Sequence, residues 1–253
     1  MMQSVTPLTR PNYLLVVPDL AALYRRAAEE FRKCAAAAVH EFGRFSVALS
    51  GGNTPRGLYE LLARENSTSL PWDRIHIFFG DERHVPPDGP DSNYRMVRET
   101  LLAKVPIPES NVYRVRAELA AQAAADDYEK QVREFFRLQP GEWPRFDLIL
   151  LGMGDDGHTA SLFPGTPAVQ ETTRLVVANR VEKLNSERIT LTLPVLNHAA
   201  NVIFLVSGAG KAQIMKEVFA PENSHRFPAG SVHPDRGRLL WIADHEAASL
   251  FSS

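Results

Sequence analysis

The sequence predicts an α/β protein built on a mainly parallel sheet with helices on both faces. Nearly continuous apolar runs, such as residues 45–49 and 202–206, are typical of strands that are buried on both faces. Segments between these runs carry apolar residues at spacings of three or four, which predicts helices. Strands that alternate with helices imply parallel βαβ units with right-handed crossovers.

The individual elements follow from the same patterns. Asp19 is the predicted N-cap of the first long helix, and Thr54 is the predicted N-cap of the second, with Pro55 in its first position. The first strand is expected to start near Tyr13. Further strands are expected over residues 45–49, 74–79, 146–151, 175–178, 188–193, 202–206 and 238–243. Helices are expected over 20–42, 56–64, 93–104, 118–138 and 210–219. No Ser/Gly-rich or charged linker divides the chain, so we expect residues 1–253 to form a single domain.

Composition excludes several classes of protein. The chain has 253 residues, 44% of them hydrophobic, and a formal net charge of -2, which gives no bulk attraction to nucleic acid or to an anionic membrane. No stretch approaches the roughly 18 apolar residues of a membrane-spanning helix. Residues 1–10 lack the apolar segment of a signal peptide, and Cys34 is the single cysteine. We therefore expect a cytoplasmic protein without disulfides; the sequence carries no signal of its oligomeric state.

The first informative motif follows the strand predicted at 45–49. It reads Ser50-Gly51-Gly52-Asn53-Thr54, and a helix follows it. Two glycines allow a sharp turn and a close approach of the backbone to a ligand, and the N-terminus of the helix favours an anion such as phosphate. A tight strand–helix turn without a ligand explains the same residues equally well.

The second motif, Gly80-Asp81-Glu82-Arg83, follows the strand predicted at 74–79. Three adjacent charged residues at the end of a buried strand need either solvent or a polar site, so a surface loop is the alternative to a binding site. The site interpretation gains support because parallel strands present their carboxyl ends at one edge of the sheet, where ligands bind. Residues 91–94 are predicted to cap the next helix.

The third motif is the richest in chemistry. Gly152, Gly154 and Gly157 match the dinucleotide fingerprint, but Pro164 interrupts any helix that follows, and Asn179 stands where an acidic residue would hold a ribose. Nicotinamide binding is therefore not expected. His158 follows directly after a glycine and lies two residues from Asp156, an arrangement suited to a general base that a carboxylate orients.

A fourth motif, Gly208-Ala209-Gly210-Lys211, follows the strand at 202–206. It is not a Walker A loop, but Lys211 in the first turn of a helix could hold a phosphate; a solvated lysine is the alternative. His225 and His233 are too isolated to predict a metal site. A metal site is therefore not expected.

These motifs together resemble the 6-phosphogluconolactonase family. Their order and spacing match the family from about Leu14 to Phe251, and the stretch 156–164 is the most specific part. The resemblance implies a Rossmann-like fold shared with glucosamine-6-phosphate deaminase and ribose-5-phosphate isomerase. It also implies hydrolysis of 6-phospho-D-glucono-1,5-lactone, a small-molecule substrate, in the oxidative pentose phosphate pathway, without a metal or organic cofactor.

The resemblance also implies roles for individual residues. His158 matches the family's proposed general base, and Arg83, Arg188 and Lys211 match basic residues near the substrate. In the mechanism that we expect, Asp156 orients or electrostatically supports the imidazole, and either Arg83 or the backbone amides of the 152–157 turn stabilise the oxyanion. The predicted substrate- and phosphate-binding residues are Ser50, Gly51, Gly52, Asn53, Thr54, Asp81, Arg188 and Lys211. One departure is visible: the family usually has prolines after a lysine in the segment before Arg188, whereas this chain has Lys183-Leu184-Asn185, which predicts a less rigid loop.

Two other functions are associated with parts of this pattern. A hexosamine-6-phosphate deaminase also carries Asp-Gly-His, but continues with Ile-Ala-Phe-Asn-Glu-Pro; here residues 159–164 read Thr-Ala-Ser-Leu-Phe-Pro, without the acid. A non-enzymatic sugar-phosphate sensor would carry a DNA-binding module, for which a first strand near Tyr13 leaves no room. Both are disfavoured relative to the lactonase.

Overall fold

The computed structural model describes residues 5–8, 12–66, 69–220, 223 and 226–251. In this part of the chain, seven strands form one sheet in the order β1-β2-β10-β9-β6-β3-β4. Neighbouring strands from β2 to β4 run parallel, and β1 pairs antiparallel with β2. The bounds of these strands are β1 (Val5–Leu8), β2 (Asn12–Val17), β3 (Phe45–Leu49), β4 (Ile75–Phe79), β6 (Leu148–Leu151), β9 (Asn201–Val206) and β10 (Arg238–Asp244). The predicted fold class is confirmed.

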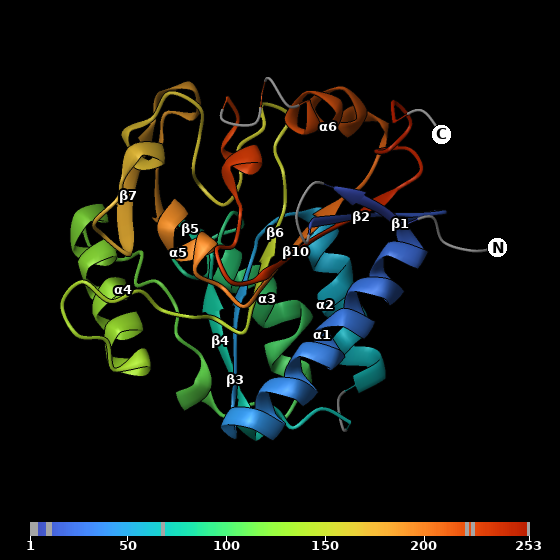
Figure 1. The fold of residues 1–253 in the computed structure, drawn as a ribbon. Helices are drawn as coiled ribbons and strands as arrows, with labels where there is room; N and C mark the ends of the chain where they lie inside the picture. The colour runs from blue at the N-terminus through green and yellow to red at the C-terminus, as the bar shows by residue number, and fades with distance from the viewer. Residues whose placement is uncertain (1–4, 9–11, 67–68, 221–222, 224–225, 252–253) are drawn as a thin grey trace.

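Helices cover both faces of this sheet, as Figure 1 shows with α1 and α2 on one side and α4 on the other. Side chains alternate along each strand, so that β9 gives Ile203 and Leu205 to the core beneath α1 and Phe204 to the core on the opposite face. The helices are α1 (Leu20–Phe42), α2 (Asn53–Asn66), α3 (Asn93–Thr100), α4 (Ala121–Phe136), α5 (Leu193–Asn197) and α6 (Ala212–Phe219). No described helix is both long and apolar enough to cross a membrane.

Two predicted helix starts have different outcomes. Asp19 caps α1 as expected, because its carboxylate accepts a 2.7 Å hydrogen bond from the amide of Ala22. The prediction that Thr54 caps α2 is wrong: the helix already begins at Asn53, and the Thr54 hydroxyl instead bonds to that of Ser207 at 2.8 Å. The side chain of Thr54 therefore joins two turns of the chain and does not close a helix end.

A second, smaller sheet contains the strands β5 (Asp81–Arg83), β8 (Ser186–Leu191) and β7 (Val176–Val181), all antiparallel. The segment 81–83 was predicted as a polar loop or binding segment without strand structure, and the strand expected at 188–193 lies in this second sheet. Gly80 connects the two sheets: its amide donates to Leu49 O at 2.8 Å, and its carbonyl accepts from the amide of Leu191 at 2.9 Å. The chain thus passes from one sheet to the other at a single residue.

The order of the strands places a ligand site between β3 and β6. From β3 the chain continues to β4 on one side, whereas β6 and β9 lie on the other side. This reversal of direction is a topological switch point, where open α/β sheets bind ligands at the carboxyl ends of their strands. The glycine-rich turns after β3 and after β6 flank this point.

Candidate active site

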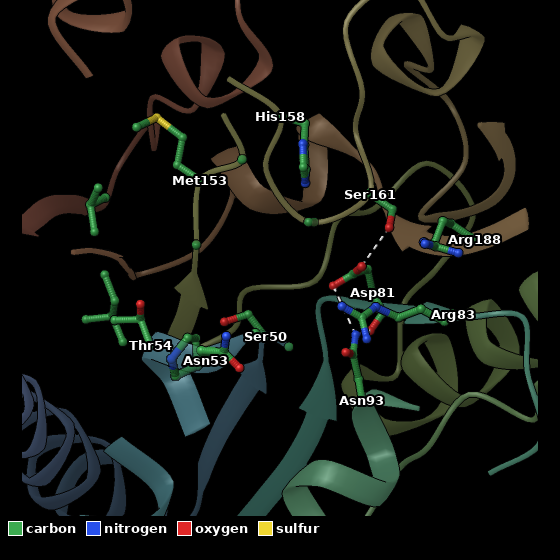
Figure 2. Close-up of a pocket in the computed structure, with 18 of the residues that line it drawn as sticks. Ser50, Asn53, Thr54, Asp81, Arg83, Asn93, Met153, His158, Ser161 and Arg188 are labelled. Carbon is green, nitrogen blue, oxygen red and sulfur yellow. Dashed lines mark hydrogen bonds between the residues drawn. The ribbon is translucent and has the colours of Figure 1, made fainter. Parts of the chain in front are cut away.

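A cavity of about 560 Å³ lies at the carboxyl ends of β3, β6 and β9. Figure 2 shows His158 pointing into it from one side, with the turn of Ser50 to Thr54 and the side chain of Asp81 on the opposite side. Ten of the eleven predicted site residues line this cavity: Ser50, Gly51, Gly52, Asn53, Thr54, Asp81, Arg83, His158, Arg188 and Lys211. Asp156, the remaining one, lies behind the imidazole of His158.

The turn after β3 uses its two glycines for different purposes. Gly52 has φ 103°, a left-handed conformation that glycine adopts without strain. Gly51 makes room for a neighbour: a Cβ at this position would lie 1.9 Å from Asn93 Oδ1. The predicted close approach at Gly51 is therefore made to the side chain of Asn93. This contact packs the start of α3 against the turn at the start of α2.

Asp81 is buried at the centre of a hydrogen-bond network. Its Oδ2 accepts a 2.6 Å bond from the hydroxyl of Ser161, and its backbone carbonyl accepts a 2.9 Å bond from Nδ2 of Asn93. Figure 2 draws the contacts of the carboxylate with both neighbours. These bonds join three separate parts of the chain: β5, α3 and the turn that follows β6.

Glu82, next to Asp81, is buried on the opposite side of β5 and supports α3. Its carboxylate accepts bonds of 2.7 and 2.8 Å from the amides of Asn93 and Tyr94, at the start of that helix. Ser92 provides the predicted cap, since its hydroxyl accepts from the amide of Arg95. Burial raises the pKa of Glu82 to about 6, although the amide donors lower it. Glu82 therefore has a structural role at the start of α3 and lies outside the cavity.

Arg83 and Arg188 lie opposite each other on the paired strands β5 and β8. Arg83 is held by a 2.6 Å bond from its guanidinium to the carbonyl of Asp91. Burial, together with the positive charge of Arg83, lowers the pKa of Arg188. Two cations that repel each other beside a cavity form a favourable place for an anion or for a developing negative charge.

Lys211 also lines the cavity. It lies in the short 3₁₀ helix η6 (Ala209–Lys211), and its ammonium forms an ion pair with Asp155. Ser207, which precedes this segment, bonds to Thr54. The segment that leads to Lys211 is therefore tied to the first turn of α2, and the N-terminus of α2 and Lys211, which both line the cavity, are candidates for a second anion contact.

The turn after β6 explains the glycine pattern that resembles a dinucleotide fingerprint. A Cβ at Gly154 would lie 2.0 Å from the imidazole of His158, and Gly157 has φ 74° with the ring of Phe227 against it. The segment that follows forms turns and a 3₁₀ helix, not the long helix of a nucleotide-binding fold. Gly154 thus makes room for the histidine ring.

His158 and Asp156 form a short hydrogen-bonded pair. The distance from His158 Nδ1 to Asp156 Oδ1 is 2.5 Å, and the same oxygen accepts the backbone amide of His158 at 3.1 Å. Because a carboxylate only accepts, Nδ1 carries the proton in this pair, and Nε2 is left with a lone pair. The tautomer is the one that a general base in the cavity requires.

The surroundings keep this imidazole neutral. Burial lowers the pKa of His158 to about 4; Asp81 and Asp155 raise it, whereas Lys211 and Arg188 lower it. The ring also stacks on Phe163 at a centroid distance of 4.0 Å. At neutral pH His158 is therefore able to accept a proton.

The site also contains residues that were not predicted as site residues, among them Ser161, Phe163, Asn93 and Lys183. Ser161 and Phe163 follow His158 in the same motif, and both line the cavity. Ser161 bonds to Asp81, which is distant in sequence, whereas Phe163 stacks on the nearby His158. Asn93 was predicted only as part of a helix cap. Lys183 was noted in the sequence only as part of the loop that departs from the family pattern. In the structure it forms an ion pair with Asp156. No described group of three or more His, Cys, Asp or Glu residues could hold a metal ion.

The fold and the cavity define an α/β enzyme in which a neutral imidazole, backed by a carboxylate, shares a cavity with several cations. The chain belongs to the family of glucosamine-6-phosphate isomerases and 6-phosphogluconolactonases, whose sequence model matches residues 18–241. The resemblance seen in the sequence motifs is thereby confirmed.

Named relatives agree with this membership. The chain is 47% identical over 212 residues to a 6-phosphogluconolactonase of Synechocystis sp., covering 83% of this chain and 86% of the relative. It is 44% identical to a 6-phosphogluconolactonase of Nostoc sp., covering 94% and 97%. Among solved structures, the 6-phosphogluconolactonase of Trypanosoma cruzi superposes with a TM-score of 0.86 at 33% identity, covering 95% of this chain and 97% of that one.

Proposed function

We propose that this protein hydrolyses 6-phospho-D-glucono-1,5-lactone to 6-phospho-D-gluconate in the cytoplasm, as part of the oxidative pentose phosphate pathway. The observation that carries the proposal is the neutral His158, oriented by Asp156 and facing a cavity with two cationic ends. Family membership and the names of the relatives support the same reaction.

The two cationic ends suit the two ends of the substrate. The phosphate lies at the N-terminus of α2, where the amides of the glycine turn and Lys211 receive it. The lactone carbonyl then points toward Arg83 and Arg188. Binding of the phosphate holds the lactone ring in a fixed orientation. Binding energy from this remote contact thereby places C1 correctly for attack.

Hydrolysis then needs two proton transfers, both through His158. Nε2 takes a proton from water as the water oxygen bonds to C1, and Asp156 stabilises the imidazolium that forms. Negative charge on the former carbonyl oxygen is stabilised by Arg83. The C1–O5 bond then breaks, and the imidazolium returns its proton to O5, which yields the open-chain acid and restores the neutral base.

The proposal is tested by generating the phosphorylated lactone in situ and following acid release, with spontaneous hydrolysis subtracted. Unphosphorylated gluconolactone and added EDTA serve as controls. Acceleration that resists EDTA and is confined to the phosphorylated lactone supports both the reaction and the phosphate anchor. If the folded protein gives no acceleration, the lactonase proposal is wrong, and deaminase activity is the next assay.

A further inference from the structure

The tip of the β7–β8 hairpin reaches the turn that carries His158. The two strands are joined by the 3₁₀ helix η5 (Glu182–Leu184), and Lys183 at this tip forms an ion pair with Asp156. The ammonium of Lys183 also lies 4.9 Å from the ring centroid of Phe163. Leu184 and Arg188 of the same hairpin line the cavity. One hairpin thus contributes cavity residues and also contacts the partner of the imidazole.

Both oxygens of Asp156 are engaged by these contacts. Oδ1 accepts from the backbone amide and from Nδ1 of His158, and Oδ2 faces the ammonium of Lys183. Phe163 completes a closed set of contacts, since it stacks on His158 with an interplanar angle of 25° and has Lys183 over its ring. The imidazole is therefore held from two sides, and Lys183 participates in both.

We propose that Lys183 is a positioning residue for the lactonase reaction: it fixes the Asp156 carboxylate in the orientation that engages His158 and offsets part of its negative charge. The role rests on the proposed function of the site, and Lys183 acts through Asp156 without touching the substrate. The carboxylate has side-chain exposure of 31% and the lysine 53%, so solvent competes for both, and the ion pair restrains a group that would otherwise turn toward water.

The charge of Lys183 has a consequence for the protonation of His158. The charged groups that face the imidazole are Asp81 from β5, Asp155 and Asp156 from its own turn, Lys211 from η6 and Arg188 from β8. An unpaired Asp156 would favour the imidazolium, because an adjacent opposite charge stabilises the protonated form. Lys183 opposes this effect. Removing its charge is therefore expected to raise the pKa of His158.

The test compares Lys183→Met with the wild type. Methionine keeps much of the apolar stem over Phe163 but lacks the ammonium. We expect kcat at neutral pH to fall several-fold, and the acid limb of kcat/KM to move to higher pH by about 0.5–1 unit, a modest shift because the pair is partly exposed. NMR titration of His158 without substrate should show the same shift. Lys183→Arg should restore the wild-type profile.

Arg180→Met is the matched control. Arg180 lies on the same hairpin but contacts Glu182 and Asn185 at its tip and is not paired with Asp156. Removing this cation should leave the acid limb and the NMR titration in place.

Two results would overturn the proposal. If Lys183→Met raises KM for the phosphorylated lactone while the acid limb and the NMR titration stay unchanged, Lys183 contacts the substrate directly. If none of these quantities changes, Lys183 has no role in the site. A wild-type protein without lactonase activity would contradict the proposed function instead, and the substrate-free titration would still measure the coupling between Lys183 and His158.

Discussion

The hydroxyl of Ser161 donates a 2.6 Å hydrogen bond to Oδ2 of the buried Asp81 carboxylate. This bond joins the turn that carries His158 to the strand that carries Arg83. The turn follows β6 of the main sheet, whereas Arg83 lies in β5 of the second sheet, so the distance between the imidazole and the guanidinium depends on contacts of this kind. Ser161 is itself fixed, because its carbonyl accepts from Nδ2 of Asn179 at 2.9 Å.

Ser161→Ala should therefore weaken both stability and activity. A buried carboxylate oxygen loses its donor, which costs about 1–3 kcal/mol in the free energy of unfolding. Urea denaturation measures this loss, and the same preparation should show a reduced kcat. Ser249→Ala, at an exposed position, is the control and should change neither. Wild-type stability in Ser161→Ala would show that Asp81 does not depend on this hydroxyl.

His158→Asn should lower kcat by about 10²–10⁴-fold with little change in KM, because general-base catalysis is lost while the phosphate contacts remain. Steady-state kinetics with the phosphorylated lactone measure both constants, and a thermal melt checks that the variant is folded. An unchanged kcat would remove His158 from the mechanism.

The acid limb of kcat/KM should lie near pH 4. His158 acts as a base only when neutral, and its pKa is lowered to about 4 by burial. As the pH falls below this value the imidazolium accumulates and the rate should fall, whereas the rate should be level from about pH 5 to 7. A pH–rate profile of the wild type measures the limb. A limb near 6.5, the ordinary pKa of histidine, would contradict the interpretation of a desolvated ring.

Lys211→Met and Arg188→Met should affect different constants. A lost charge-assisted contact to phosphate weakens binding by about 10- to 100-fold, so Lys211→Met should raise KM for the phosphorylated lactone. Arg188→Met should mainly lower kcat, because Arg188 lies beside Arg83 at the carbonyl end. The opposite pattern, with KM raised only by Arg188→Met, would place the phosphate at the arginine pair.

Gly154→Ala should displace the catalytic ring. Its Cβ would lie 2.0 Å from His158, whereas a Cβ at Gly152 meets nothing within 4 Å among the described residues. We expect kcat to fall at least tenfold in Gly154→Ala, on the order of the penalty for a 1 Å misplacement. Gly152→Ala should show a much smaller loss. Equal effects of the two substitutions would show that the close contact at Gly154 is unimportant.

Strands β3, β6, β9 and β10 of the main sheet could be predicted from the sequence because they are buried on both faces and therefore read as continuous apolar runs, whereas the edge strand β1 was not predicted. The second sheet could not, since β5 is only three residues long and consists of Asp81, Glu82 and Arg83. A strand is recognised by apolar or alternating residues, and this one pairs with a segment more than 100 positions away. Asp81 and Arg83 were predicted to lie at the ligand edge of the sheet, and both line the cavity, but the pairing of β5 with β8 was not predicted.

The candidate site shows the same division. Residues within one turn, such as Asp156 and His158, could be paired from their spacing. Most other cavity residues could be predicted because ligands bind at the carboxyl ends of parallel strands. Contacts between distant segments carry no local signal. The approach of Asn93 to Gly51, the bond from Thr54 to Ser207 and the ion pair from Lys183 to Asp156 depend on tertiary packing. These three could be found only in the folded chain.

The double attachment of Gly80 restricts how the length of this chain can vary. Its amide is bonded to one sheet and its carbonyl to the other. One residue inserted or deleted here would shift Arg83 along its strand by about 3.3 Å and turn its side chain to the opposite face. Insertions and deletions among related sequences should therefore avoid the junction between β4 and β5 and collect in exposed connections that hold no cavity residue.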